Sequence, residues 1–154
     1  MTPLRVARLK AAQDGWIEVT FDSGWHCRIG IVADGLGRVL FTAPDGLREP
    51  VTWSIAPNVG KAQDRTQVFA RSIASVAQSN DGATAESATL RANIRLEPFA
   101  IDWEQKIGDN WHVCCRDRAS YAYGSAARSG TLTHWQARDA EDQYFGLGDK
   151  TGPL

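Results

Sequence analysis

The sequence predicts an all-β fold, an antiparallel sandwich or barrel. Short runs of residues alternate between apolar and polar with a period of two, and turn-forming residues recur about every ten residues. The clearest run, residues 88–97, places alanine, leucine and isoleucine on one face and threonine, asparagine and charged residues on the other. No repeat, low-complexity tract or internal linker interrupts the chain, so residues 1–154 are expected to form one domain.

The first half of the chain contains the pattern of a β-hairpin. Residues 16–21 and 25–31 both alternate, and Asp22-Ser23-Gly24 between them is a typical turn sequence. A short strand at 38–41 and another at 51–55 follow after further glycine- and proline-containing breaks. Residues 56–66 read as a polar loop.

The second half adds more short strands. Residues 67–78 fit one helical face about as well as a strand, and we favour a strand because of their β-branched content and the flanking pattern. Alternation also predicts strands at 99–103, 111–115 and 131–137. Arg116 to Gly130 is expected to be a long loop.

Composition excludes several classes of protein. The chain has 17 Lys and Arg residues and 18 Asp and Glu residues, and this balance with no basic stripe argues against nucleic-acid binding. No apolar run is long enough to span a membrane, and no secretory signal is evident. The odd set Cys27, Cys114 and Cys115 suits a reduced, cytoplasmic protein better than a disulfide framework.

Two segments of the chain resemble a known family. The segment from Ile94 to Trp103, IRLEPFAIDW, is similar to the strand pair that precedes the catalytic barrel in family 31 glycoside hydrolases. The segment from Tyr144 to Leu154, YFGLGDKTGPL, resembles that family's Tyr-Gly-Leu-Gly-Glu-Lys-Thr-Gly-Pro-Leu signature. It departs from the signature by the inserted Phe145 and by Asp149 in place of glutamate. The likeness is strong from about residue 89 onward.

The resemblance implies the N-terminal β-sandwich, of the galactose-mutarotase-like (supersandwich) type, of a retaining α-glucosidase. In that family a (β/α)8 barrel supplies the nucleophile and the acid/base carboxylate, and none of its motifs occurs here. The expected role is therefore non-catalytic, with no catalytic residue, metal or cofactor in this chain. The expected partners are the catalytic barrel of the parent protein, an α-linked glucoside bound through it, and a second copy where an apolar face is exposed. The residues expected to contact the barrel and shape the pocket are Tyr144, Gly146, Gly148, Asp149 and Lys150.

Other residues are candidates for catalytic or metal-binding chemistry within this chain. Retaining hydrolysis needs two carboxyl groups roughly 5–5.5 Å apart, and Asp102 with Glu104 share a strand face. The acidic group at 139–142 is another candidate. A solvated polar face or loop explains both better. His112 with Cys114 is a weak zinc pattern, and Cys27 with His134 is an unsupported nucleophile and base.

Aromatic residues raise an alternative function, a free-standing carbohydrate-binding module. Flat aromatic faces suit pyranose rings, and the best candidates for sugar contact are Tyr121, Tyr123 and Trp135. The two tyrosines fall in the expected loop, while Trp135 shares a face with two threonines. A mutarotase-like epimerase is a third reading, but none of the three histidines lies in a motif that supports it.

Overall fold

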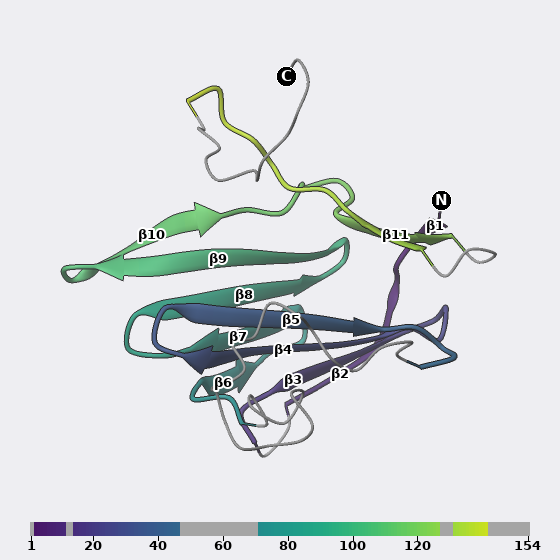
Figure 1. Ribbon diagram of the computed structural model, residues 1–154, viewed down its shortest axis with the longest axis horizontal. Coiled ribbons are helices and arrows are strands. Elements are labelled where there is room, and N and C mark those ends of the chain that lie inside the picture. The colour runs from purple at the N-terminus through teal and green to yellow at the C-terminus, as the bar shows by residue number, and fades with distance from the viewer. Residues whose placement is uncertain (1, 12–13, 47–70, 127–130, 142–154) are drawn as a thin grey trace, which may run out of the picture.

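The computed structural model describes residues 2–11, 14–46, 71–126 and 131–141. These ranges form twelve β-strands and no helix (Figure 1). The strands are β1 (Thr2–Pro3), β2 (Val6–Ala11), β3 (Ile17–Phe21), β4 (His26–Ala33), β5 (Leu36–Thr42), β6 (Ser75–Gln78), β7 (Gly82–Glu86), β8 (Leu90–Leu96), β9 (Phe99–Ile107), β10 (Asn110–Cys115), β11 (Tyr123–Ala126) and β12 (Thr131–His134). The all-β prediction is confirmed.

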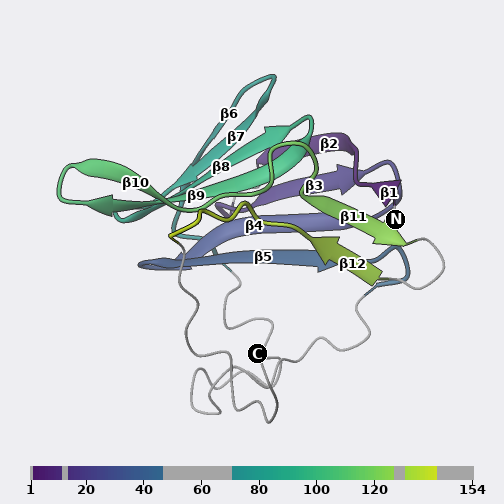
Figure 2. The same cartoon turned by 90° about the horizontal axis from the view of Figure 1, so that it is seen from above.

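The strands form three antiparallel sheets, of which the two larger make a sandwich (Figure 2). One layer has the order β2-β3-β4-β5, and the other has the order β10-β9-β8-β7-β6. Each layer is a meander, in which every strand pairs with its neighbours in sequence. The hairpin expected at residues 16–31 is β3 and β4, joined by a turn in which Gly24 has a φ of 81°.

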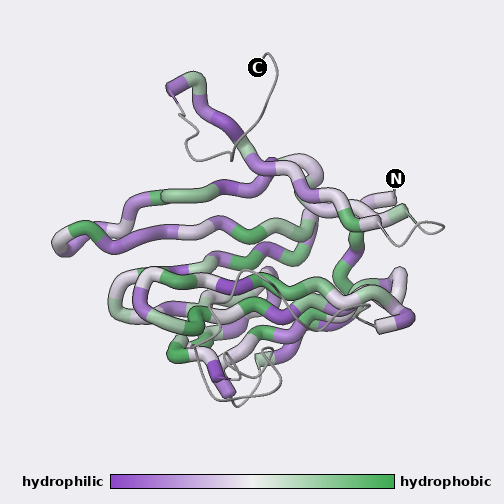
Figure 3. Tube along the Cα trace, in the orientation of Figure 1, coloured by the Kyte–Doolittle hydropathy of each residue, from purple (hydrophilic) through white to green (hydrophobic). Residues whose placement is uncertain are grey.

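The core lies between the two layers because each inner strand turns one of its faces inward. In β3 the residues Ile17, Val19 and Phe21 are at most 2% exposed, while the residues between them are half-buried. Phe99 of β9 meets Phe21 edge to face, with ring centroids 4.9 Å apart. Figure 3 shows this alternation as green and purple segments that follow one another along the strands of the sandwich, while the described stretch after β12 is mostly hydrophilic.

The five-stranded layer extends beyond the four-stranded one. Strand β2 lies against β6, β4 against β7 and β5 against β8, so β9 and β10 reach past β5, the last strand of the other layer. Where β9 passes β5, the Trp103 indole covers Gly37, and a Cβ added to Gly37 would overlap the ring. On the opposite side Gln78 joins the layers: its amide oxygen accepts from the Ala11 N–H and its amide nitrogen donates to the Leu9 carbonyl.

The third sheet, ordered β1-β11-β12, lies at one end of the sandwich. Residues Thr2 and Pro3 pair with Ser125 and Gly124, so the beginning of the chain is held against a segment from its second half. The β11 partner on the other side is β12, with Tyr123 opposite His134.

Three expectations from the sequence need correction. Of the expected strand at 67–78 the structure describes residues 71–78, and within these Ser75–Gln78 is a strand while residues 71–74 are not, because the Ser72 hydroxyl accepts hydrogen bonds from the N–H groups of Ile31 and Ala74. The expected loop at 116–130 contains strand β11, since Tyr123 to Ala126 pair with β12 and two of these residues, Gly124 and Ser125, also pair with β1. The expected strand at 131–137 ends at His134. The expected strand at 51–55 lies outside the described residues.

Candidate functional site

A buried carboxylate lies at the junction of the sandwich and the third sheet. Asp117 is 1% exposed, and its Oδ2 accepts a 2.8 Å hydrogen bond from the Ile101 N–H on β9. Its own N–H donates to the Asp102 carboxylate at 3.0 Å. Since a buried carboxyl group without partners is very costly, the bond from the Ile101 N–H helps to make this interior position tolerable.

Two rings of the third sheet complete the surroundings of Asp117. The Nε2 atom of His134 lies 2.6 Å from Asp117 Oδ1, and the imidazole stacks on the Tyr123 ring at 4.4 Å with an interplanar angle of 3°. Burial, and then the nearby Asp117 charge, raises the pKa of the Tyr123 hydroxyl well above its usual value. Tyr123 therefore stays neutral and can donate a hydrogen bond.

This group of residues, Asp117, His134 and Tyr123, is the Asp117 cluster. Within it, Oδ1 of Asp117 meets Nε2 of the imidazole, while Oδ2 binds the Ile101 N–H on β9. The arrangement ties strand β9 to strand β12 and leaves no oxygen of Asp117 turned toward solvent. The sequence did not single out Asp117, because a residue between Arg116 and Arg118 reads as part of a solvated loop.

The aromatic residues weighed for sugar contact have different environments. Tyr123 is 5% exposed and belongs to strand β11, so the expectation that it lies exposed in a loop is wrong. The Tyr121 side chain covers Gly124, where an added Cβ would overlap its hydroxyl. Trp135 is half-buried and packs on Tyr121 with ring centroids 4.8 Å apart. Sugar contact stays a prediction, and Tyr121 with Trp135 offers the accessible aromatic surface for it.

The paired carboxylates of β9 are engaged in other contacts. Glu104 accepts hydrogen bonds from Arg91 at 3.2 Å and Asn93 at 3.0 Å, while Asp102 accepts from the Asp117 N–H. Arg91 also binds Glu86 at 2.7 Å and lies over the Trp111 ring at 4.1 Å. The outer face of the five-stranded sheet thus carries a network of charges rather than a free acid/base pair.

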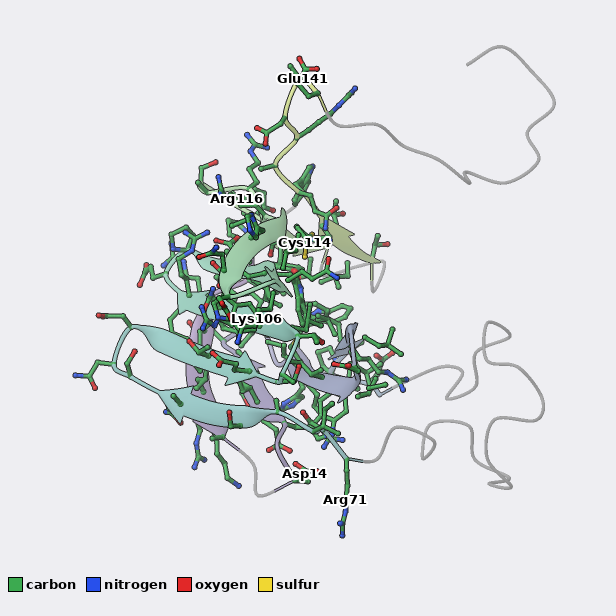
Figure 4. All side chains as sticks on the ribbon, turned by 90° about the vertical axis from the view of Figure 1, so that its left-hand side faces the viewer. Asp14, Arg71, Lys106, Cys114, Arg116 and Glu141 are labelled. Carbon is green, nitrogen blue, oxygen red and sulfur yellow. The ribbon has the colours of Figure 1, made fainter. Side chains whose placement is uncertain are left out.

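The acidic turn and the residues of the weak zinc pattern lie in different parts of the structure. Glu141 is exposed at the far end of the described chain, beyond Arg116 in Figure 4, and Asp142 lies outside the described residues. His112 is exposed, and the Cys114 thiol donates to the Trp103 carbonyl. Within the described ranges no group of three or more His, Cys, Asp or Glu side chains is placed to hold a metal ion.

The cysteine and histidine that were considered as nucleophile and base do not form a pair. Cys27 is 1% exposed on β4, and burial raises the pKa of its thiol well above the usual value. His134 is bound to Asp117 instead. The low thiolate content of a buried cysteine makes it a packing residue.

A cleft of about 920 Å³ lies between the N-terminal segment and the turn that joins β8 and β9. Leu4 and Phe99 contribute apolar surface to it, and Arg5, Asp22 and Glu97 are among its charged lining residues. Because side chains of both charges line it, this cleft favours no single class of charged ligand.

The residues expected to contact a barrel are Tyr144, Gly146, Gly148, Asp149 and Lys150, and they lie outside the described residues. The part of the chain that is described contains no helix long and apolar enough to cross a bilayer.

The two-layer antiparallel architecture, with a third small sheet at one end, places the chain among the β-sandwich domains. A comparison with family models matches residues 26–154 to the glycosyl hydrolase 31 N-terminal galactose mutarotase-like domain, and the chain belongs to that family. A search of curated proteins finds no match. The sandwich type expected from the sequence is confirmed.

Proposed function

We propose that this chain is the non-catalytic N-terminal domain of a retaining α-glucosidase-type glycoside hydrolase, active in the cytoplasm. In this role it supports the (β/α)8 barrel of the parent protein and helps to shape the pocket for an α-linked glucoside. The observation that carries the proposal is the family match over residues 26–154, which includes the glycine-rich signature near the end of the sequence.

The contacts of the described carboxylates favour a non-catalytic role. Retaining hydrolysis needs one carboxylate free to attack and a second carboxyl group near it that is protonated. Asp102, Glu104 and Asp117 are each held by backbone or side-chain donors. The hydrogen bonds of Asp117 favour a structural role for this carboxylate. Cleavage of the glycosidic bond then falls to the barrel.

The test compares the isolated chain with the protein encoded by its continuous reading frame. The isolated chain should leave an α-glucoside such as p-nitrophenyl α-glucopyranoside intact, and the protein with the barrel should cleave it. Gly148→Val should lower the activity or stability of the longer protein, because the added side chain blocks close approach of backbone. Lys10→Ala, on the exposed part of β2, is the matched control. Cleavage by the isolated chain would overturn the proposal.

The free-standing carbohydrate-binding module remains a second candidate because Tyr121 and Trp135 form a half-buried aromatic pair. Calorimetric titration with maltose and with glucose separates the two functions. The accessory role predicts no heat of binding for the isolated chain. Binding that is lost in Trp135→Ala would establish the module instead.

A further inference from the structure

Strand β10 is an open edge of the five-stranded sheet. It is the outermost strand in the order β10-β9-β8-β7-β6, and in the described part of the chain only β9 pairs with it (Figure 1). Figure 2 shows the β9–β10 hairpin projecting past the turn of the neighbouring sheet. An open edge presents unpaired N–H and C=O groups to which another strand can bind.

Apart from an irregularity in the pairing between Val113 and Cys115, this edge lacks the devices with which proteins usually protect such strands. Residues 110–115 contain no proline and no Lys, Arg, Asp or Glu. Val113 is 45% exposed and Ile107, at the tip of the hairpin, is 61% exposed. Trp111 is fixed beside them, because Arg91 and Lys106 both lie over its ring.

The turn of the hairpin determines which backbone groups face outward. Ile107 and Asn110 are paired across Gly108 and Asp109, with φ of 60° at Gly108, which is typical of a two-residue hairpin turn. Residues flanking such a turn form a hydrogen-bonded pair, and the pairs alternate along the ladder. The N–H and C=O groups of Trp111 and Val113 are therefore the ones directed to the open edge.

These two residues make the edge complementary to itself. In an antiparallel arrangement about a two-fold axis at His112, Trp111 of one copy lies opposite Val113 of the other, and the reverse pair forms as well. Each such pair exchanges two hydrogen bonds and keeps its side chains on one face of the joined sheet. The flanking charges fit this register too, since Arg116 of one copy comes within one position of Asp109 of the other.

We propose that the chain forms a homodimer through β10, in which two five-stranded sheets join edge to edge about His112. A second copy suits this edge because the arrangement is isologous and brings no like charges together. It also covers the exposed Val113 of each copy with Trp111 of the other. The contact is independent of the proposed function, since it requires neither a barrel nor a sugar.

The dimer should appear as a concentration-dependent increase in mass by light scattering or sedimentation, between about 1 and 500 µM, because an edge contact of this size is weak. Val113→Lys should weaken it by about tenfold or more, since charged edge residues oppose strand addition. Leu36→Lys is the matched control, because Leu36 is 47% exposed on β5. A chain that stays monomeric over this range overturns the proposal, and so does an equal loss of dimer in both variants.

Two further variants test the geometry. Val113→Pro removes an N–H that faces the open edge, so it should abolish the dimer and leave the β9 pairing in place. In a Cys114→Ser background, His112→Cys should form a disulfide-linked dimer on mild oxidation, and Leu36→Cys should not. Disulfide formation that is no faster for His112→Cys than for Leu36→Cys would contradict the two-fold axis at His112.

Discussion

His134 Nε2 lies 2.6 Å from Asp117 Oδ1, and through this contact the third sheet is attached to the sandwich. The other oxygen of Asp117 binds the backbone of β9, so a single side chain joins two sheets. The segment beyond β12, which leads toward the glycine-rich signature, therefore starts from a fixed position.

Replacement of Asp117 should destabilise the protein strongly. Asp117→Ala leaves the Ile101 N–H and the His134 ring nitrogen without their present partner, and we expect a loss of about 3 kcal/mol in the free energy of unfolding. Urea unfolding measures this loss. Asp109→Ala, at the exposed hairpin turn, is the control and should change stability by less than about 0.5 kcal/mol. Equal effects of both substitutions would contradict the tie between the sheets.

Tyr123 should make the protein sensitive to alkali. The pKa of this phenol is raised in the folded state, so its contribution to stability is complete below the unfolded value near 10 and falls as the pH rises above it. The free energy of unfolding should decrease there by up to about 1.4 kcal/mol per pH unit for one proton. Tyr123→Phe should reduce this slope by one proton and leave the curve below about pH 9 parallel to that of the parent. An unchanged slope would exclude Tyr123 as the source.

The three cysteines should react in a fixed order. Cys27 is buried and Cys114 is exposed, and burial raises the pKa of all three thiols. Because the thiolate is the reactive form, alkylation by iodoacetamide near neutral pH should be slower than for a free thiol and should accelerate as the pH rises. Mass spectrometry should find Cys114 modified first and Cys27 modified only in denaturant. Early modification of Cys27 in the native protein would show that its strand opens.

Tyr121 and Gly124 should be coupled. Gly124→Ala places a Cβ against the Tyr121 hydroxyl and should cost about 1–3 kcal/mol. Tyr121→Phe alone should cost less than about 0.5 kcal/mol, since this buried hydroxyl has no hydrogen-bond partner among the described residues. In the double variant the cost should be smaller than the sum by at least about 0.5 kcal/mol, as determined by a double-mutant cycle. Additive effects would mean that the two residues do not meet.

The sequence was most informative where one face of a strand is buried. In β8 the alternation of Ala92 and Ile94 with Arg91 and Asn93 survives unchanged, because one face meets the core and the other meets solvent. Strand β11 was missed because Gly124, Ser125 and Ala126 are small and show no alternation, and its pairing is set by contacts with β1 and β12. The Asp117 cluster could not be predicted either, since its members are brought together by the pairing of β11 with β12, and β11 was not expected from the sequence.

The paired strands of the large layers are close together in sequence, whereas those of the small sheet include a pair that is far apart. This difference affects the order in which the sheets can fold. The two large layers consist of hairpins between consecutive strands, so their contacts close short loops. The β1–β11 pair joins Thr2 to Ser125 and requires all of the chain between these two residues. During synthesis Thr2 and Pro3 must therefore stay unpaired until Ser125 has left the ribosome, and we expect this small sheet to assemble after the two large layers.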